Sequence, residues 1–401
     1  MDKGKIKKKS EIIQNFMLTL SNFVYLCKME NINTTHSIII GAAQNMEQLK
    51  DNSIELVVTS PPYPMIKMWD EIMAKQNPEI QTALDKNDGA KAFELMHLEL
   101  DKVWAEVERV LIPGGFACIN IGDSTRTING EFALYPSHSR IISAFQKLGV
   151  PNLPNILWRK QTNAPNKFMG SGMLPSGAYV TLEHEWVLIF RKGSKRQFKT
   201  ESEKLRRKES SFFWEERNVW FSDLWDLKGT KQKIDNSKTR KRSAAYPFEL
   251  PYRLINMYSL QGDTVLDPFL GTGTTSLAAI ASNRNSVGYE IDPMFLNIIT
   301  ENIESTPVTF FNSIIQNRID QHINFITERN ADIKKGDIKH YNDNLKLPVM
   351  TNQETDIKLN FVTSVKRTDK KLVATYDSVK PKNVEFTFKQ TKGEEKTLFD
   401  L

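Results

Sequence analysis

An alternation of short apolar runs with helix-like segments between residues 37 and 121 limits the possible folds of this chain more than any other feature. Apolar runs at 37–40, 54–58 and 116–121 have the length of strands, and the helical period before the last run stops at Pro113-Gly114-Gly115. This alternation predicts an α/β fold in which helices cover a doubly wound, mostly parallel sheet. Open sheets of this kind bind ligands outside the carboxyl ends of their strands, so a site is expected there.

The second half of the chain repeats this pattern after two interruptions. Residues 161–179 are rich in Asn, Pro, Gly and Ser, which indicates a loop beside a site, and between 191 and 243 clusters of basic residues alternate with aromatic ones. We interpret the second stretch as an inserted module whose aromatic residues form a small core rather than base-stacking platforms. Further strands are predicted at 187–190, 264–266 and 287–291. The expected domains are an N-terminal helical arm (1–36), two halves of one α/β domain (37–190 and 244–305), the insert (191–243) and a C-terminal extension without assigned chemistry (306–401).

Composition narrows the classes of function. The 401 residues carry a formal net charge of +6 and the sequence pI is near 9.0, which favours an anionic partner such as nucleic acid. Cys27 and Cys118 have no metal or redox spacing, which indicates a reducing cytoplasm, and Glu183-His184-Glu185 lacks a second histidine at ligand spacing. We therefore expect no metal. No run approaches the ~20 apolar residues of a membrane span.

The first motif with chemical content is IELVVTSPPY at 54–63, an apolar strand that ends in Ser60, Pro61, Pro62 and Tyr63. Two consecutive prolines fix the backbone and remove two N–H donors, so the loop offers rigid acceptors beside an aromatic face. An exocyclic amino group of a base can donate to the Ser60 hydroxyl and the Pro61 carbonyl while Tyr63 stacks on the ring. The loop is thus a candidate site for methylation of an amine.

The second motif is GDTVLDPFLGTGTT at 262–275, in which a strand leads into a glycine turn that opens a helix. Glycines allow close approach to the backbone, and helix N-termini attract carboxylates. Asp267 is a candidate partner for an ammonium group, and Glu290, at the end of the next strand, for ribose hydroxyls. The predicted cofactor-binding residues are Asp267, Pro268, Phe269, Gly271, Gly273, Thr274 and Glu290.

With these motifs the chain resembles the bacterial DNA amino-methyltransferases of restriction-modification systems, which methylate cytosine N4 or adenine N6. The resemblance covers about residues 38–304, and the order of the motifs is that of the beta class. It implies a Rossmann-like class I methyltransferase fold, S-adenosyl-L-methionine as cofactor, and duplex DNA from which the target base is rotated. One departure is Ala42-Ala43, where relatives often carry an acid.

The resemblance also implies a base and a DNA-binding region. Relatives with serine at position 60 are mostly cytosine-N4 enzymes, which favours N4 of cytosine over the alternative, N6 of adenine. An RNA or protein-glutamine methyltransferase and a degenerate, DNA-binding relative are rival functions. Host protection from a cognate restriction endonuclease is expected, and a homodimer stays open. The residues expected to contact DNA are Lys195, Arg196, Arg206, Arg207, Lys208, Arg240, Lys241 and Arg242.

Overall fold

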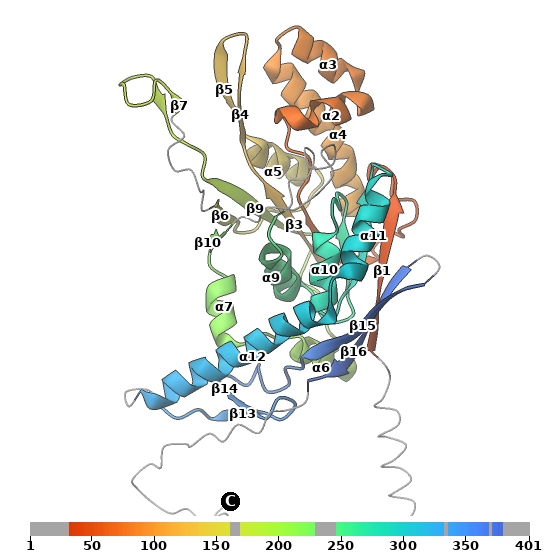
Figure 1. Ribbon diagram of the computed structural model, residues 1–401, viewed down its shortest axis with the longest axis vertical. Helices are drawn as coiled ribbons and strands as arrows, with labels where there is room; N and C mark the ends of the chain where they lie inside the picture. The colour runs from red at the N-terminus through yellow and green to blue at the C-terminus, as the bar shows by residue number, and fades with distance from the viewer. Residues whose placement is uncertain (1–31, 161–168, 229–245, 333–335, 369–370, 380–401) are drawn as a thin grey trace, which may run out of the picture.

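The computed structural model describes residues 32–160, 169–228, 246–332, 336–368 and 371–379. A ten-stranded sheet forms its centre, with the strand order β10-β6-β9-β3-β2-β11-β12-β1-β16-β15 (Figure 1). The strands are β1 (Ile32–Ile40), β2 (Ile54–Thr59), β3 (Leu111–Ile121), β6 (Ile156–Lys160), β9 (His184–Arg191), β10 (Leu224–Leu227), β11 (Thr264–Asp267), β12 (Asn285–Glu290), β15 (Asn360–Thr368) and β16 (Lys371–Ser378).

Five neighbouring strands, β3, β2, β11, β12 and β1, run parallel to one another, which confirms the predicted α/β class. Their carboxyl ends therefore share one edge of the sheet, here called the catalytic edge. Strand β9 runs antiparallel to both β3 and β6, so it is the amino end of β9 that lies at this edge. The opposite edge, where the parallel strands begin, is called the amino edge.

The two faces of the sheet carry separate hydrophobic cores, because side chains alternate along each strand. Val57 of β2 joins a core with Trp104 of α4 (Gly89–Val110) and Phe145 of α5 (Ser137–Lys147). Its neighbours Leu56 and Val58 join the other core, with α9 (Glu249–Tyr258) and α10 (Thr274–Ala281). The apolar strands predicted from the sequence are thus buried on both sides, as parallel strands usually are.

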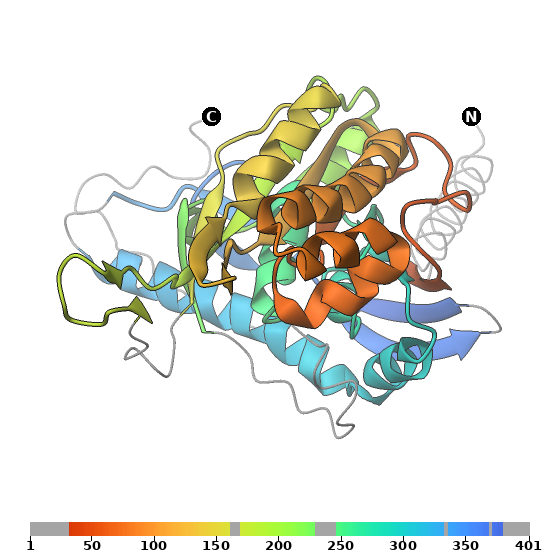
Figure 2. The same ribbon diagram turned by 90° about the horizontal axis from the view of Figure 1, so that it is seen from above.

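Short elements surround the catalytic edge. The chain leaves β2 through a 3-10 turn (Lys67–Trp69) into α2 (Asp70–Gln76) and α3 (Pro78–Asp85), which Figure 1 shows above the sheet. Two hairpins extend on the same side: β4 (Ser124–Ile128) with β5 (Glu131–Tyr135), and β7 (Met169–Gly170) with β8 (Ala178–Tyr179). From above, the β7–β8 hairpin and the β15–β16 pair lie on opposite sides of the molecule (Figure 2). Within the loop predicted at 161–179, residues 161–168 lie outside the described part.

The described part of the predicted insert has no core of its own. It contains α6 (Glu201–Glu209), α7 (Trp214–Trp220) and β10, and β10 extends the main sheet by pairing with β6. Trp225 packs into the core beneath α9, and Phe213 into a third cluster with α12 (Val308–Ala331). Phe213, Trp220 and Trp225 are thus buried, whereas Trp214 and Phe221 are exposed. Phe213 and Trp225 belong to the cores of the body rather than to a core of the insert.

The C-terminal extension completes the sheet. After α11 (Phe295–Ser305) and α12 come the pair β13 (His340–Asn342) and β14 (Leu347–Val349), and then the β15–β16 hairpin. Strand β16 pairs antiparallel with β1, which begins at Ile32, so residues 32–36 are strand rather than part of the expected helical arm. Residues 1–31 of that arm lie outside the described part. None of the helices described is both long and apolar enough to cross a bilayer.

Candidate active site

A cavity of about 330 Å³ lies at the catalytic edge, where β2, β11 and β12 end. Ser60, Pro61, Pro62 and Tyr63 form one part of its wall. The turn after β11 and the end of β12 form another part, with Asp267, Pro268, Phe269, Gly271, Thr274 and Glu290. Two motifs some two hundred residues apart in sequence therefore face the same cavity, as their positions at the ends of parallel strands predict.

The loop at 60–63, predicted from the sequence to be the catalytic loop, is held by hydrogen bonds from neighbouring strands. The Ser60 hydroxyl donates to the Tyr63 hydroxyl over 3.2 Å, and Tyr63 in turn donates to Glu185 at the start of β9 over 2.8 Å. The Asn120 amide of β3 donates to Tyr63 over 2.9 Å and to Glu185 over 2.7 Å. The ammonium of Lys160, at the end of β6, contacts the second oxygen of Glu185. Three strands, β3, β6 and β9, thus contribute to one polar network behind the loop.

The ring of Tyr63 lies directly over Gly122. A methyl group added at Gly122 would come within 3.0 Å of the ring and within 3.3 Å of the Glu185 side chain, so glycine is needed for this packing. Burial, together with the nearby carboxylate of Glu185, raises the pKa of the Tyr63 hydroxyl well above its usual value. Tyr63 is therefore neutral and keeps its proton for the bond to Glu185.

Asp267 joins the two motifs. Its carboxylate, 2% exposed, accepts hydrogen bonds from Thr59 of β2 over 2.6 Å and from the Phe269 backbone over 3.0 Å, and its other oxygen accepts from Tyr246 and Thr275. Burial raises the pKa of Asp267, whereas these donors act against that rise. The four bonds use the acceptor sites that the sequence-based hypothesis reserved for an ammonium group. The geometry thus shows Asp267 as the link between β2 and β11.

The glycine turn and Glu290 form the remaining wall. Gly271 and Gly273 both have positive φ, +55° and +86°, which other residues rarely adopt. The Glu290 carboxylate accepts the Gly271 and Asp292 backbone N–H groups, each over 3.0 Å, and burial raises its pKa. Gly273 is the one predicted cofactor residue outside the cavity wall, because it packs the start of α10 against Ile299.

Comparison with known proteins identifies this arrangement. Residues 54–301 match the N6/N4 family of DNA methylases. The chain is also 54% identical over 336 residues to the Type II methyltransferase M.MthZI of Methanothermobacter thermautotrophicus, an alignment that covers 83% of this chain and 92% of that protein. The chain belongs to the N6/N4 DNA methylase family. The resemblance seen in its two motifs is thereby confirmed.

Two further proteins similar to this chain are also described as DNA methylases or methyltransferases. The Type II methyltransferase M.MjaI of Methanocaldococcus jannaschii is 52% identical over 284 residues, which are 68% of this chain and 92% of that protein. A protein of Thermus thermophilus, described as a putative DNA modification methylase and solved with S-adenosyl-L-methionine, superposes with a TM-score of 0.52 at 30% identity. The match covers 67% of this chain and 93% of that protein, so the methylase shares the fold of this group.

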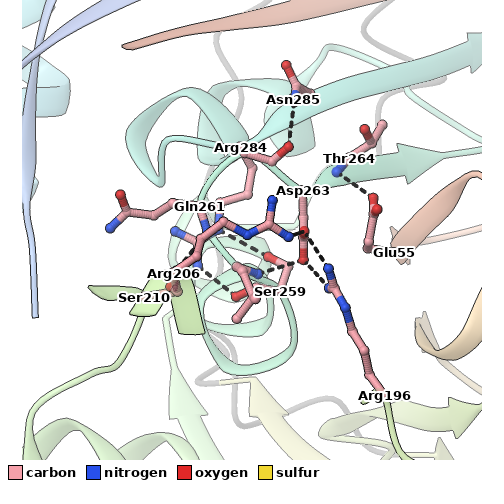
Figure 3. Close-up of polar contacts among 12 residues, drawn as sticks. Glu55, Arg196, Arg206, Ser210, Ser259, Gln261, Asp263, Thr264, Arg284 and Asn285 are labelled. Carbon is pink, nitrogen blue, oxygen red and sulfur yellow. Dashed lines mark hydrogen bonds and ion pairs between the residues drawn. The ribbon is translucent and has the colours of Figure 1, made fainter. Parts of the chain in front are cut away.

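None of the predicted DNA contacts that the structure describes lines the cavity of the methylase. Arg196 and Arg206 both bind Asp263, the residue before β11 at the amino edge (Figure 3). The side chain of Asp263 is 1% exposed. Arg196 donates two hydrogen bonds, of 2.6 and 3.1 Å, and Arg206 one of 2.8 Å.

The other predicted DNA contacts of the methylase divide into two groups. Lys195, Arg207 and Lys208 are exposed; Arg207 lies over the Phe198 ring and Lys208 pairs with Asp356. Arg240, Lys241 and Arg242 lie outside the described residues. The contact of all these residues with DNA stays a prediction, but the geometry gives Arg196 and Arg206 a different partner, a buried carboxylate.

Three polar residues of the site escaped the sequence analysis: Asn120, Lys160 and Glu185. The carboxylate of Glu185 was noticed only as part of a Glu-His-Glu stretch that lacks the ligand spacing of a metal site. The usable signal is a carboxylate at the start of β9, directly before its apolar residues, combined with the antiparallel direction of that strand. No group of three His, Cys, Asp or Glu side chains among the described residues is arranged to hold a metal ion.

Proposed function

We propose that this methylase transfers the methyl group of S-adenosyl-L-methionine to N4 of a cytosine in duplex DNA, as the modification enzyme of a restriction-modification system. The observation that carries the choice of base is Ser60 at the cavity wall, since family members with serine there are mostly N4-cytosine enzymes. The role in restriction and modification rests on the names of the two archaeal relatives, both Type II methyltransferases. Pairing with a restriction endonuclease belongs to the same proposal.

The cavity wall fits the proposed cofactor, which is bound to the Thermus protein. Each Glu290 oxygen accepts one backbone N–H and keeps capacity for a further donor, so we assign Glu290 to ribose hydroxyls. A Cβ added at Gly271 would meet no atom closer than 3.9 Å, which leaves the backbone before α10 open to a carboxylate. When bound, the cofactor supplies an electrophilic methyl group.

The hydrogen bonding of Ser60 supports its role as an acceptor. Its own hydrogen points to Tyr63, and one of its lone pairs accepts a long bond of 3.5 Å from the Asn120 amide, so the other lone pair remains for a donor in the cavity. An exocyclic amine that donates to Ser60 and to the Pro61 carbonyl is held in one orientation. In that orientation the lone pair of its nitrogen is out of conjugation with the ring. Catalysis then rests on positioning and electrostatics, without a covalent enzyme intermediate.

The geometry also narrows the proposed path of the DNA. A rotated base has to enter at the catalytic edge, whereas α6 lies below the sheet in Figure 1. Strand β10 runs parallel to β6 and ends at Leu227 on the catalytic edge, and Tyr246 lines the cavity. Arg196 and Arg206, in contrast, bind Asp263 at the amino edge, which disfavours them as phosphate contacts.

The test is to sequence DNA from cells that express the methylase, with detection of modified bases, and to identify the methylated nucleoside by mass spectrometry. We expect N4-methylcytosine within one sequence context. N6-methyladenine in its place would overturn the choice of base, and DNA that never acquires a methyl group would overturn the function.

A further inference from the structure

Amino-group methylation leaves a proton to be removed. As the nitrogen–carbon bond forms, the carbon–sulfur bond breaks and its electron pair passes to sulfur, so the nitrogen of the base carries a positive charge and one hydrogen too many. An N–H bond then has to break, and its electron pair returns to nitrogen. The proton needs an acceptor in a site that excludes bulk water.

The hydrogen bonds behind the catalytic loop run in one direction from the cavity. Ser60 donates to Tyr63, and Tyr63 donates to Glu185. The Asn120 amide is a donor to both Tyr63 and Glu185, so it cannot accept the hydrogen of the tyrosine hydroxyl. Within this cluster that hydrogen therefore goes to Glu185. A proton that arrives at Ser60 can therefore move along the chain without rotation of any group, because each hydroxyl already points to the next oxygen.

Glu185 has the properties of the end of such a chain. Its side chain is 11% exposed, and the ammonium of Lys160 balances its charge. Lys160 itself is held over the Trp158 ring, 4.8 Å from the ring centroid, and is 40% exposed. The pair thus lies between the loop at the cavity wall and solvent, to which the proton can finally pass.

We propose that Glu185, supported by Lys160, is the positioning residue of this site and the terminal acceptor of the proton released by the base. It directs the Tyr63 hydroxyl, and through it the Ser60 hydrogen, away from the cavity, so that Ser60 faces the base as an acceptor. After transfer, Ser60 takes the proton of the base as its own passes to Tyr63, and that of Tyr63 passes to Glu185. The inference rests on the proposed function, because it requires an amine as substrate.

The main test is Glu185→Gln, which keeps the size of the side chain but removes its charge. Loss of a proton acceptor typically slows a reaction 10²-fold or more, so we expect kcat to fall by about that factor while the KM for DNA and the Kd for S-adenosyl-L-methionine stay unchanged. The matched control is Glu183→Gln, since Glu183 is 42% exposed and lies 4.0 Å from Arg159 outside the network. This control should retain the kcat of the wild type.

Two further variants separate this role from a merely structural one. Lys160→Arg keeps the counter-charge and should retain most of the activity, whereas Lys160→Met should lose it at unchanged KM. Tyr63→Phe breaks the chain but keeps the ring, and combined with Glu185→Gln it should add no further loss, because both act on one path.

Specific results would overturn the proposal. An active wild type with an equally active Glu185→Gln variant would show that the carboxylate is not needed. A Glu185→Gln variant that instead loses cofactor binding would give Glu185 a structural role. A wild type that methylates no DNA would overturn the proposed function itself, which the same assay reveals before any variant is compared.

Discussion

The ion pairs at Asp263 allow a sharp separation of structural from DNA-binding arginines. The carboxylate is 1% exposed and accepts two hydrogen bonds from Arg196, one from Arg206 and one, of 2.8 Å, from the Leu260 backbone. Arg196→Met removes two of these four bonds and one of the two guanidinium groups that bind this buried carboxylate. The perturbation therefore falls on the fold at the amino edge.

The expected loss in the free energy of unfolding follows from the number of bonds to Asp263 that the substitution removes. Removal of the sole partner of a buried charge costs about 3–5 kcal/mol. Because Arg206 remains, although 41% exposed, we expect Arg196→Met to lower the free energy of unfolding by about 2–3 kcal/mol. Lys195→Met is the matched control, since this neighbouring side chain is exposed and its expected change is within about 0.5 kcal/mol.

The assay combines urea unfolding with DNA binding at several salt concentrations. If Arg196 is structural, the variant loses stability but keeps the salt dependence of DNA affinity, measured where the protein is folded. A phosphate contact would instead reduce the slope of affinity against salt by about one ion. Unchanged stability together with a reduced slope would refute the structural reasoning and restore the DNA contact predicted from the sequence.

Three other predictions concern the site and the core. Thr59→Val removes the bond to Asp267 at constant shape, so it should cost about 1.5–3 kcal/mol of stability and weaken both cofactor binding and transfer; calorimetric titration that finds full affinity would contradict this link. Ser60→Ala should abolish transfer of labelled methyl groups yet bind the cofactor normally, and a loss of binding would move Ser60 to the cofactor side. Burial lowers the pKa of His97 to about 3, and neither ring nitrogen has a hydrogen-bond partner among the residues that the structure describes. The unfolded chain therefore binds a proton that the fold does not, and the fold loses about 1.4 kcal/mol per pH unit as pH falls from about 6.5 toward 3. His97→Leu should lessen that loss, which acid unfolding curves would reveal.

The central strands and the cavity could be predicted from the sequence because each rests on local patterns. The apolar run at 54–58 is strand β2 with one added residue, and the run at 264–266 is β11, which ends on Asp267. Strand β3 begins earlier than predicted, at Leu111, and takes in Pro113-Gly114-Gly115, where its register against β2 shifts. The residues at which the helical period was expected to stop thus belong to an irregular strand, and the helix ends earlier, at Val110.

The insert was harder to predict, because a cluster of charges does not specify its partner. Arg196 and Arg206 belong to clusters of basic residues that are typical of a phosphate-binding surface. Only the folded positions of α6, which carries Arg206, and of the segment before it, which carries Arg196, bring them to Asp263. The carboxylate they bind lies some sixty residues further along the chain. A one-dimensional pattern of charge cannot distinguish a polyanion from a buried acid of the same protein.

Local patterns in the chain were enough to establish the fold class, the family and the pairing of the Ser60 loop with the Asp267 turn, since parallel strands place their carboxyl ends at one edge. The polar groups behind that loop became known only from the folded arrangement. Glu185 reaches Tyr63 because β9 runs against its neighbours, and Asp267 is satisfied by Thr59 because β2 and β11 are adjacent. Strand direction and adjacency arise from long-range packing, which leaves no periodic mark in the local sequence.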